Sequence, residues 1–439
     1  MRRYYIETYG CQMNVRDSET LAGEMEALGL VATDRAEEAD VVVLNTCSVR
    51  EKPHHKVYSR LGELVRLKAR RPQMVIAVCG CMAQVVGDRV RERTPQVDII
   101  LGPRNVARFA DALQRVWAGA GPVVTRDTAE LVPEGLPVRR CAGVTAYVNV
   151  TYGCDNFCAY CIVPYARGRE VSREPEEIVA EVRQAVAQGY REVVLLGQNV
   201  NSYGRGLGRQ VDFPDLLARV NEVEGLARVR FTTSHPRDCS EKLLQRMAEL
   251  DKVCEHLHLP LQFGDDEMLA RMGRGYTYEQ YRATVERARE LIEGLAVTTD
   301  LMVGAPGESP QAFERTLQAV QEIRFDGAFM FKYNDRPGTR AAQMPDKVPE
   351  EEKQRRLVEL VKLQNTIARE VNQALVGRQF EVLVEKEDER QAGFMRGRTR
   401  QHKTMVFPGG AELRGQLLVV RAEEAYLWGF KGRMEGEKA

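Results

Sequence analysis

Three cysteines at a short fixed spacing are the strongest chemical signal in the sequence. Cys154, Cys158 and Cys161 form the pattern C-x3-C-x2-C within the string GCDNFCAYCIVPYARGRE. Three thiolates can hold a cubic [4Fe–4S] cluster through three of its irons and leave the fourth iron open for reaction. A zinc site or a purely structural cluster is the alternative, but zinc sites usually recruit a fourth Cys or His at similar spacing and none follows here.

A second set of cysteines is spread over the amino-terminal part of the chain. Cys11, Cys47 and Cys81 each follow a run that predicts a strand, in YIETYGC, VVVLNTC and VIAVCGC. Because the ends of parallel strands share one edge of a sheet, we expect the three thiols to converge where such sheets bind ligands. The alternative is that each thiol is a small buried core residue. That alternative is favoured for the cysteines without such a placement, which are Cys79, Cys141, Cys239 and Cys254.

The elements that must position these cysteines alternate between strands and helices. Residues 1–117 combine short β-rich runs with amphipathic stretches, which predicts an α/β domain with a parallel sheet. Residues 118–140 are rich in Gly, Pro and charge, so a linker is expected there. From 141 to 370, six strand-like runs with helices between most of them favour a partial (β/α) barrel, in which catalytic loops follow the strands.

The tail of the chain changes character. Residues 374–436 contain short strands separated by turns, which predicts a small all-β barrel of the oligonucleotide-binding sort. A local basic stretch there, accompanied by Phe394, suits phosphates and an exposed loop base. The alternative is an ordinary solvated hairpin. The predicted RNA contacts are Arg396, Arg398, Arg400 and Lys403.

Composition limits the possible partners and location. The 63 basic and 63 acidic residues cancel, so any RNA-binding surface must be local. Ten cysteines in a chain long enough to bury a core indicate metal or redox chemistry rather than disulfides. No run of 18 apolar residues occurs, and the first residues turn polar at once, so we expect a cytoplasmic protein without a membrane segment.

The loop of Cys154, Cys158 and Cys161, with the aromatic residues Phe157 and Tyr160 inside it, resembles that of radical S-adenosylmethionine (SAM) enzymes. Together with TYGCQMNVRDSE, NTCSVRE, GCMAQ, LLGQNVNSYG, FTTSHP, LHLPLQ and RPGT, it resembles the methylthiotransferase family along nearly the whole chain. The resemblance implies a radical SAM barrel, a carboxy-terminal TRAM domain, SAM as cofactor and two [4Fe–4S] clusters. The auxiliary cluster would fall on Cys11, Cys47 and Cys81.

The resemblance also implies a reaction. The C2–H bond of adenine is strong, and a carbon radical can abstract its hydrogen where acid–base chemistry cannot. In this family one SAM methylates a sulfur on the auxiliary cluster and a second SAM supplies the radical, so no catalytic residue is assigned apart from the two clusters. An electron donor and a sulfur donor are implied, without an identity for either.

The expected substrate is N6-dimethylallyladenosine beside the anticodon of tRNA, which would become its 2-methylthio derivative. The strings NTCSVREKPHHKVYSRLG, PYARGREVSRE and LLGQNVNSYG look most like the family members with that substrate. The nearest alternative is a sister enzyme acting on threonylcarbamoyladenosine in tRNA or on a ribosomal-protein aspartate. A noncatalytic iron–sulfur protein that binds RNA and senses redox state is a more distant one.

Residues at predicted strand ends are candidates for SAM contacts, because ligands of such barrels bind there. Turn formation and strand-end capping explain them equally well. One departure from the family pattern is Gln262-Phe263-Gly264-Asp265, where Q-S-G-S is common, and it puts the contacts of that loop in doubt. The candidates are Gln198, Asn199, Ser234, His235, Gln262 and Gly304.

Overall fold

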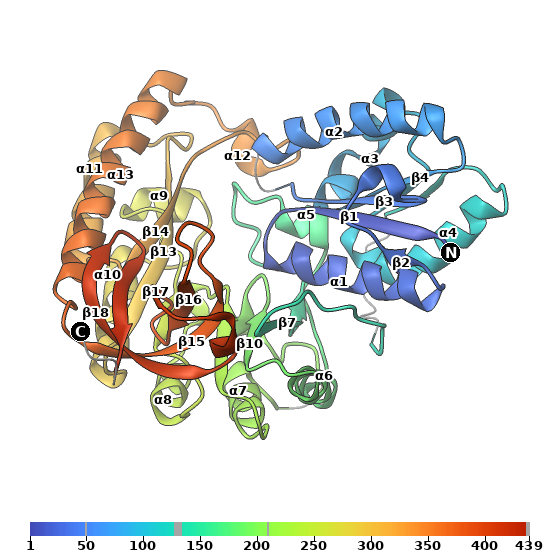
Figure 1. Cartoon of the computed structure of the whole chain (residues 1–439). Helices are drawn as coiled ribbons and strands as arrows, with labels where there is room; N and C mark the ends of the chain where they lie inside the picture. Colours follow the sequence, from blue (N-terminus) through green and yellow to red (C-terminus); the bar gives the residue numbers. More distant parts are fainter. Residues whose placement is uncertain (49–50, 127–133, 209, 436–439) are drawn as a thin grey trace.

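An all-parallel sheet forms the amino-terminal lobe of the protein (Figure 1). The computed structural model describes residues 1–48, 51–126, 134–208 and 210–435. The strands lie in the order β2-β1-β3-β4-β5-β6. Their bounds are β1 (Arg3–Tyr9), β2 (Val31–Ala32), β3 (Val41–Thr46), β4 (Val75–Gly80), β5 (Ile99–Leu101) and β6 (Val123–Thr125).

Helices cover both faces of this sheet, as expected when strands are buried on both sides. One face packs Leu21 of α1 (Gln12–Ala27) and Phe109 of α4 (Phe109–Trp117) against side chains such as Val43. The other face packs Leu61 of α2 (Glu51–Arg70) and Met82 of α3 (Cys81–Arg93) against Val42 and Leu44. Successive strand residues therefore alternate between two cores.

The segment expected to be a linker, 118–140, contributes the edge strand β6, which pairs with β5. The expected linker therefore starts too early. The three residues of β6 follow Gly119 and Gly121, and so short a strand leaves no periodicity that could separate it from a loop. Residues 127–133 of the segment lie outside the described part.

Six parallel strands form the partial barrel in the centre, as the sequence predicted. They make two three-stranded sheets, β11-β10-β7 and β12-β13-β14. A parallel bridge from Val229 of β11 to Val253, just before β12, connects the two sheets. The short strands β8 (Thr151–Tyr152) and β9 (Val171–Ser172) pair beside them. The barrel strands are β7 (Thr145–Asn149), β10 (Glu192–Leu196), β11 (Arg228–Thr232), β12 (His256–His258), β13 (Ala296–Val303) and β14 (Gly327–Lys332).

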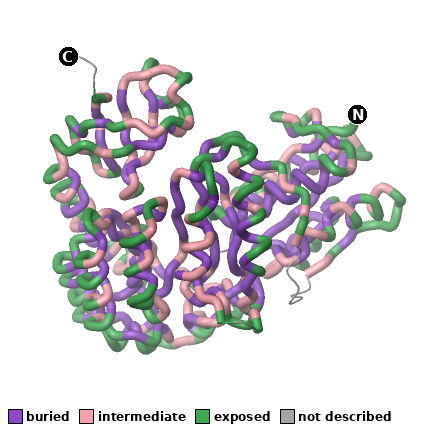
Figure 2. The backbone as a smooth tube through the Cα atoms, turned by 90° about the horizontal axis from the view of Figure 1, so that it is seen from below, coloured by how far each residue is buried: buried purple, intermediate pink, exposed green. Residues whose placement is uncertain are grey.

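Helices pack around the outside of these strands, and their starts carry strong local signals. Ser309 caps α11 with Pro at the next position, and Thr277 opens α10 with a capping box. Buried positions follow the strands and the inward sides of the helices (Figure 2). The helices are α5 (Val163–Arg167), α6 (Pro175–Ala187), α7 (Phe213–Asn221), α8 (Glu241–Glu249), α9 (Asp266–Arg271), α10 (Tyr278–Leu291), α11 (Pro310–Ile323), α12 (Arg340–Gln343) and α13 (Glu350–Gln373).

A closed five-stranded barrel follows the long helix α13, which confirms the predicted carboxy-terminal fold. Its small core includes Val382, Met405, Phe407 and Phe430. Closure removes exposed strand edges. The strand order is β15-β16-β17-β19-β18, with β15 (Gln379–Glu387), β16 (Phe394–Thr399), β17 (Thr404–Pro408), β18 (Leu417–Tyr426) and β19 (Gly429–Met434).

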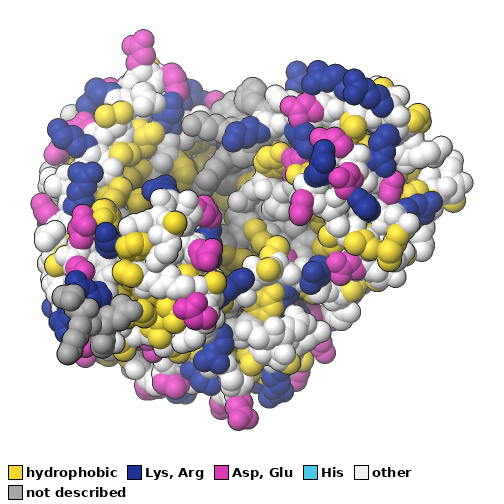
Figure 3. All heavy atoms as spheres, in the orientation of Figure 1, with side chains coloured by type: hydrophobic (Ala, Val, Ile, Leu, Met, Phe, Trp, Pro, Cys, Tyr) yellow, Lys and Arg dark blue, Asp and Glu magenta, His cyan; other side chains and the backbone are white. Residues whose placement is uncertain are grey.

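The amino-terminal lobe and the two barrels are arranged around a hollow, which the space-filling view shows between the lobes (Figure 3). Within the described ranges, no helix has the length and apolar character needed to cross a membrane.

Candidate active site

Three adjacent strands bring Cys11, Cys47 and Cys81 to one edge of the amino-terminal sheet. Thr46 at the end of β3 pairs with Gly80 at the end of β4, so the cysteines that follow them lie at the same level. Tyr9 at the end of β1 pairs with Thr46 on the other side, and Cys11 lies two residues beyond it. The predicted convergence of these positions is therefore present in the fold.

Gly80 allows the chain to turn into Cys81. Its φ is +91°, and a Cβ there would overlap the side-chain oxygen of Asn45 and the carbonyl oxygen of Thr46. Burial and the nearby charges of Cys47 and Cys11 raise the pKa of the Cys81 thiol to about 12, although Arg167 opposes the shift. A thiol in this position becomes a thiolate readily only when a cation binds it.

Buried amides beneath these cysteines were missed in the sequence, although they lie inside the motifs GCQMN and LNTC. Asn14 accepts a hydrogen bond from the Cys11 amide at 3.3 Å and donates to the Asn45 side chain at 3.3 Å. Asn45 donates in turn to Ser18 at 2.9 Å, and Thr46 donates to the carbonyl of Cys79 at 2.7 Å. This network fixes the turn that carries Cys11 against the ends of β3 and β4.

The second cysteine set lies in the loop after β7 and β8. Gly153, with φ of +72°, precedes Cys154, and a Cβ there would overlap the carbonyl oxygen of Arg169. Burial and the neighbouring Cys158 and Cys154 raise the pKa of the Cys161 thiol to about 12. Burial also raises the pKa of Cys154 to about 12. The three thiols thus lie within electrostatic reach of one another, at the strand end where the sequence predicted a reaction site.

Arg274 supports this loop from its inner side and was missed in the sequence, because it lies 116 residues from its partner. The guanidinium is buried and donates to Sγ of Cys158 and to the hydroxyl of Tyr160, both at 3.4 Å. It also donates to the hydroxyl of Tyr276 at 3.1 Å and to the carbonyl of Pro260 at 2.9 Å. A fixed cation beside a cysteine sulfur stabilises the reduced, more negative state of a bound cluster.

Buried polar atoms without a protein partner gather at the ends of the barrel strands. They are Oδ1 of Asn149 at the end of β7, Oγ1 of Thr151 in β8, Oδ1 of Asn199 after β10, and Oγ of Ser234 and Nε2 of His235 after β11. Buried polar groups nearly always have a partner, so such a group of atoms indicates a polar ligand. Asn149 and Thr151 add to the predicted contacts, and polarity at a strand end was their signal.

The other predicted SAM contacts have more varied surroundings. Gln198 reaches from β10 to the sulfur of Met13, and Gln262 bridges to Leu301 of β13 with a positive φ of 72°. Burial, with Arg274 nearby, lowers the pKa of His235 to about 2, so its ring is neutral. Gly304, at φ of +75°, lies against Lys353 of α13, which explains the glycine as a turn and packing position.

The departure at 262–265 has a structural explanation. Phe263 is fully buried in the barrel core. Asp265 caps α9 by accepting from the amide of Met268 at 2.8 Å, and it pairs with Arg315. Both unusual residues therefore stabilise the fold around the loop.

Charged residues join the amino-terminal lobe to the barrel beside both cysteine sets. Arg167, at the end of α5, donates to Asp17 of α1 at 2.8 Å. Burial would lower the pKa of the Arg167 guanidinium, but the charges of Asp17, Cys81 and Cys11 raise it well above its ordinary value. Since α5 begins two residues after Cys161, this short helix connects the two cysteine sets directly.

The sequence comparisons cover the whole architecture. The chain matches the radical SAM superfamily over residues 148–320, the uncharacterized protein family UPF0004 over 3–102 and the TRAM domain over 373–434. It is 48% identical over 435 residues to the tRNA-2-methylthio-N(6)-dimethylallyladenosine synthase of Carboxydothermus hydrogenoformans, spanning 98% of this chain and 99% of that one. The chain belongs to this synthase family. The synthase of Moorella thermoacetica is likewise 48% identical over 436 residues, spanning 99% of this chain and 98% of that one.

Solved structures support the fold of this synthase family member. The radical SAM methyltransferase TsrM from Kitasatospora setae superposes with a TM-score of 0.56 at 15% identity, covering 78% of this chain and 77% of its own. The cobalamin-dependent radical enzyme OxsB superposes with a TM-score of 0.54 at 11% identity, covering 84% of this chain and 58% of its own. At these identities the likeness concerns the fold alone.

The synthase uses SAM and two [4Fe–4S] clusters, and its donor groups fit them. Within the described residues, no three Cys, His, Asp or Glu side chains converge on one metal ion. In each cysteine set, one thiol lies within electrostatic reach of the other two. Three neighbouring thiols suit a cluster whose ligands attach to different irons. The partnerless polar atoms at the strand ends suit the amino acid and ribose groups of SAM.

Two of the predicted RNA contacts, Arg400 and Lys403, also contact the central barrel, and their RNA role stays a prediction. Arg400 donates to Glu255 at 2.7 Å and to the carbonyl of Val253 at 2.7 Å. Lys403 is buried and binds Asp326 at 2.7 Å. Both therefore dock the carboxy-terminal barrel onto the strand starts of the central barrel. Arg400 and Lys403 take their acidic partners from another domain, which no local pattern reveals.

Arg396 and Arg398 remain accessible in part. Arg396 pairs with Asp388 at 2.7 Å and Arg398 with Glu385 at 3.2 Å, and their side chains are 29% and 36% exposed. The docked surface extends to the ring of His402, which stacks on His256 at 4.8 Å. For Arg396 and Arg398, an RNA contact stays a prediction.

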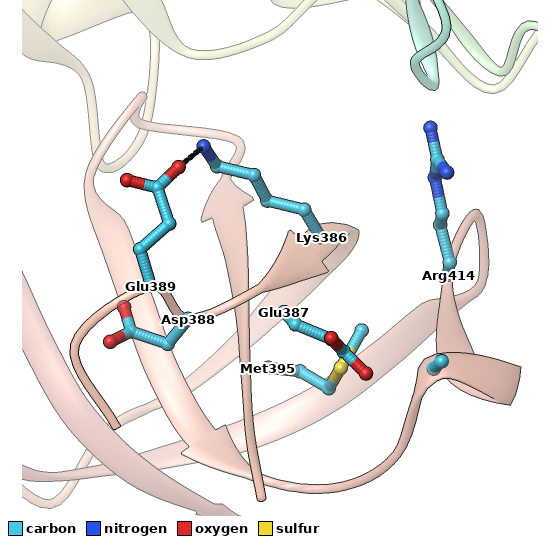
Figure 4. A pocket seen from close by; sticks show the side chains of 7 residues that line it. Lys386, Glu387, Asp388, Glu389, Met395 and Arg414 are labelled. Carbon is cyan, nitrogen blue, oxygen red and sulfur yellow. Dashed lines mark hydrogen bonds and ion pairs between the residues drawn. The ribbon is translucent and has the colours of Figure 1, made fainter. Parts of the chain in front are cut away.

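A cavity on the carboxy-terminal barrel measures about 450 Å³ (Figure 4). Its lining includes Glu387, Asp388 and Glu389, and Lys386 is paired with Glu389. Lys386 and Arg414 also line it, so the charge of the lining is mixed and gives no strongly positive surface for phosphate. The cavity also lies on a different domain from both cysteine sets, so it is not the active site.

Proposed function

We propose that the protein converts N6-dimethylallyladenosine beside the anticodon of tRNA into its 2-methylthio derivative. The observation that carries this proposal is the convergence of two three-cysteine sets at one domain interface, linked by α5 and the Arg167–Asp17 pair. Such an arrangement lets a radical generated at one set act on a base presented to sulfur at the other. Close kinship with synthases of this name supports the choice of substrate.

Each cysteine set has its own task in this proposal. Cys154, Cys158 and Cys161 hold the cluster that binds SAM, and Cys11, Cys47 and Cys81 hold the auxiliary cluster. When bound, the first cluster supplies the electron that cleaves SAM, and the second supplies the sulfur that is transferred. The protein positions both groups and excludes water from them.

The strand ends of the central barrel orient SAM in this proposal. Asn199 donates to Asp238 at 2.7 Å, which leaves its oxygen directed toward the ligand. Ser234 and the neutral His235 add an uncharged donor or acceptor each. Fixed buried dipoles of this kind hold a zwitterionic ligand without reorganising. Gln262 and Gly304 contribute through the adjoining loops.

The inner face of β12–β14 offers an apolar site for the prenyl group. Phe329 is 51% exposed, although Leu301 and Ala328 on the opposite face are buried. Its ring lies 6.0 Å from that of His258, whose Nε2 is 3.6 Å from Asp300. We place the dimethylallyl group against Phe329, where burial at about 25 cal/mol per Å² adds a few kcal/mol of preference.

The carboxy-terminal barrel binds the tRNA, through Arg396 and Arg398 among its accessible residues. RNA loops offer unstacked bases, so the target base can enter the hollow between the lobes while the barrel holds the anticodon arm (Figure 3). The reaction takes place in the cytoplasm. An external electron donor and a sulfur donor that restores the auxiliary cluster complete the cycle.

The deciding experiment incubates the reconstituted protein with SAM, a reductant and tRNA carrying either the dimethylallyl or the threonylcarbamoyl group. Nucleoside analysis should show 2-methylthio product from the dimethylallyl tRNA alone. Equal rates on threonylcarbamoyl-modified tRNA would place the protein with the sister enzymes. SAM cleavage without any methylthio product in tRNA would remove the tRNA assignment.

Phe329→Ala tests the prenyl site. The substitution should lower kcat/KM for dimethylallyl tRNA by about ten-fold, because the prenyl group loses its apolar contact. Val358→Ala, at a 58% exposed position on α13, is the control and should have no effect. An unchanged kcat/KM in Phe329→Ala would move the prenyl group elsewhere.

A further inference from the structure

Three arginines from three separate segments of the chain hold the outer side of the loop that carries Cys154 and Cys158. Arg169 pairs with Asp155 at 2.8 Å, and Arg237 donates to the side chain of Asn156 at 2.5 Å. Arg340 of α12 donates to the carbonyl of Phe157 at 3.1 Å. Three consecutive residues of the loop are thus each held by a guanidinium group.

Exposed aromatic rings lie among these arginines. Phe157 and Tyr165 are 36% and 46% exposed and meet edge to face, with ring centroids 6.1 Å apart. The guanidinium of Arg169 lies 5.8 Å from the Phe157 ring. Aromatic and arginine side chains in one patch are typical of protein interfaces. We call Phe157, Tyr165, Arg169, Arg237 and Arg340 the loop patch.

The charge presented by the loop patch is positive, although the whole chain has a formal net charge of zero. The side chain of Arg169 is 68% exposed and that of Arg237 is 40% exposed. Their acidic partners lie deeper, since Asp155 is 32% and Asp238 only 8% exposed. An approaching protein therefore meets guanidinium groups first, which favours an acidic partner.

The loop has a different inner side. Tyr160 and Arg274 meet there behind Cys158, next to the polar strand ends proposed to bind SAM. Phe157, which directly precedes Cys158, lies on the outer side. An electron that enters at Phe157 is already at the residue next to a cluster ligand. A partner on that side leaves the inner side free for SAM and the target base.

We propose that the loop patch is the docking site of an acidic protein that carries a single transferable electron. This proposal rests on the proposed function in one respect, the need for an external electron in SAM cleavage. On docking, the carrier is oxidised by one electron and the group held by Cys154, Cys158 and Cys161 is reduced by one. No electron pair or proton has to move in this step.

The test measures reduction of the cluster in the holoenzyme by stopped-flow absorbance, with a reduced flavodoxin and a reduced ferredoxin as the acidic carriers. No tRNA is added, so the outcome does not depend on methylthiolation. Variants are Arg169→Glu and Arg169→Glu/Arg340→Glu. Arg246→Glu, at a 41% exposed position on α8, is the matched control for a charge reversal elsewhere on the same domain.

The expected result is a fall of about ten-fold or more in the rate of reduction by the carrier in the loop-patch variants, with a flatter dependence on salt. Dithionite, which needs no docking site, should reduce these variants at the wild-type rate. Carrier-driven rates equal to wild type would overturn the proposal. So would a weakened affinity for tRNA with unchanged carrier kinetics, which would make the loop patch an RNA contact.

A loss of dithionite reduction needs a second variant to interpret it. Arg169→Ala removes one charge without reversing it and leaves Arg237 and Arg340 to hold the loop. If this variant loses dithionite and carrier reduction equally, the arginines serve the cluster loop itself and the proposal is overturned. A selective loss with the carrier alone supports docking.

Discussion

Arg167 and Asp17 form a buried ion pair across the interface between the amino-terminal lobe and the central barrel, with Nη2 of the arginine 2.8 Å from Oδ2 of the aspartate. Their side chains are only 4% and 6% exposed. The aspartate lies on the helix that follows Cys11, and the arginine ends the helix that follows Cys161. One contact therefore connects the supports of both cysteine sets.

Removing the cation from this pair should destabilise the interface strongly. Arg167→Met leaves Asp17 buried without a partner, so the free energy of unfolding should fall by about 3–5 kcal/mol. Urea unfolding measures this loss. Asp17→Asn in the same chain should restore much of it, because the unpaired charge is then absent. Arg169→Ala, at an exposed ion pair two residues away, is the control and should cost less than about 1 kcal/mol.

An Arg167→Met protein with wild-type stability, or no recovery in the double variant, would show that the pair does not hold the interface. Electron paramagnetic resonance of the two clusters provides a second measurement. Loss of the cation beside Cys81 and Cys11 should change the auxiliary signal more than the other one.

The two cysteine sets should have separable roles. Replacing Cys154, Cys158 and Cys161 by Ala should abolish 5′-deoxyadenosine formation, because no open iron remains to bind SAM. Replacing Cys11, Cys47 and Cys81 should preserve SAM cleavage and stop methylthiolation. Each triple variant should lose about half of the bound iron. Wild-type iron content in either variant would contradict the assignment of two clusters to these sets.

Glu181 on α6 should make the interface between the amino-terminal lobe and the central barrel sensitive to acid. Burial alone would raise its pKa, but Arg16 of α1, together with Arg173 and Arg140, lowers it to about 2. The unfolded group titrates near 4.5. A depressed carboxyl pKa stabilises the fold above the unfolded value, and this contribution of about 3 kcal/mol is lost as the pH falls from 4.5 toward 2.

Glu181→Gln should therefore lower the free energy of unfolding at pH 7 and remove the part of the acid dependence between pH 4.5 and 2 that this residue contributes. Urea unfolding of the cluster-free protein at a series of pH values tests this, since acid destroys the clusters. Glu176→Gln, on the same helix in an exposed pair with Arg219, should change stability by less than about 1 kcal/mol. Identical pH profiles for wild type and Glu181→Gln would disprove the prediction.

The carboxy-terminal barrel should respond differently to changes at its docked and accessible arginines. Arg400→Ala breaks the contact with Glu255 and should increase hydrogen exchange in β16 and β17 without altering the salt slope of tRNA binding. Arg396→Ala/Arg398→Ala should leave exchange near wild type and flatten the salt slope, because fewer counterions are released. Arg433→Ala, at an exposed pair with Glu423, is the control for both.

If Arg400→Ala flattens the salt slope and leaves hydrogen exchange unchanged, the hairpin binds RNA as the sequence alone suggested. In that case the docked arrangement would have to open when tRNA binds.

The sequence determined the elements and the chemistry that depend on local pattern. Strand-like runs that end at Cys11, Cys47 and Cys81 predicted a shared sheet edge, and the pairing of Thr46 with Gly80 places the strand ends level. Cys79 lies within β4 and enters the core with Val75 and Ala77, whereas Cys81 lies beyond the strand end and starts a helix. The spacing of Cys154, Cys158 and Cys161 was sufficient to predict a reactive loop.

Only the tertiary structure decided which charges meet. Arg167 finds Asp17 across 150 positions, Arg274 finds Cys158 across 116, and Arg400 finds Glu255 across 145. In sequence, each of these arginines is a surface charge or a possible RNA contact. Its role depends on desolvation and on the opposite charge beside it, and both are set by how separate domains pack rather than by any local periodicity.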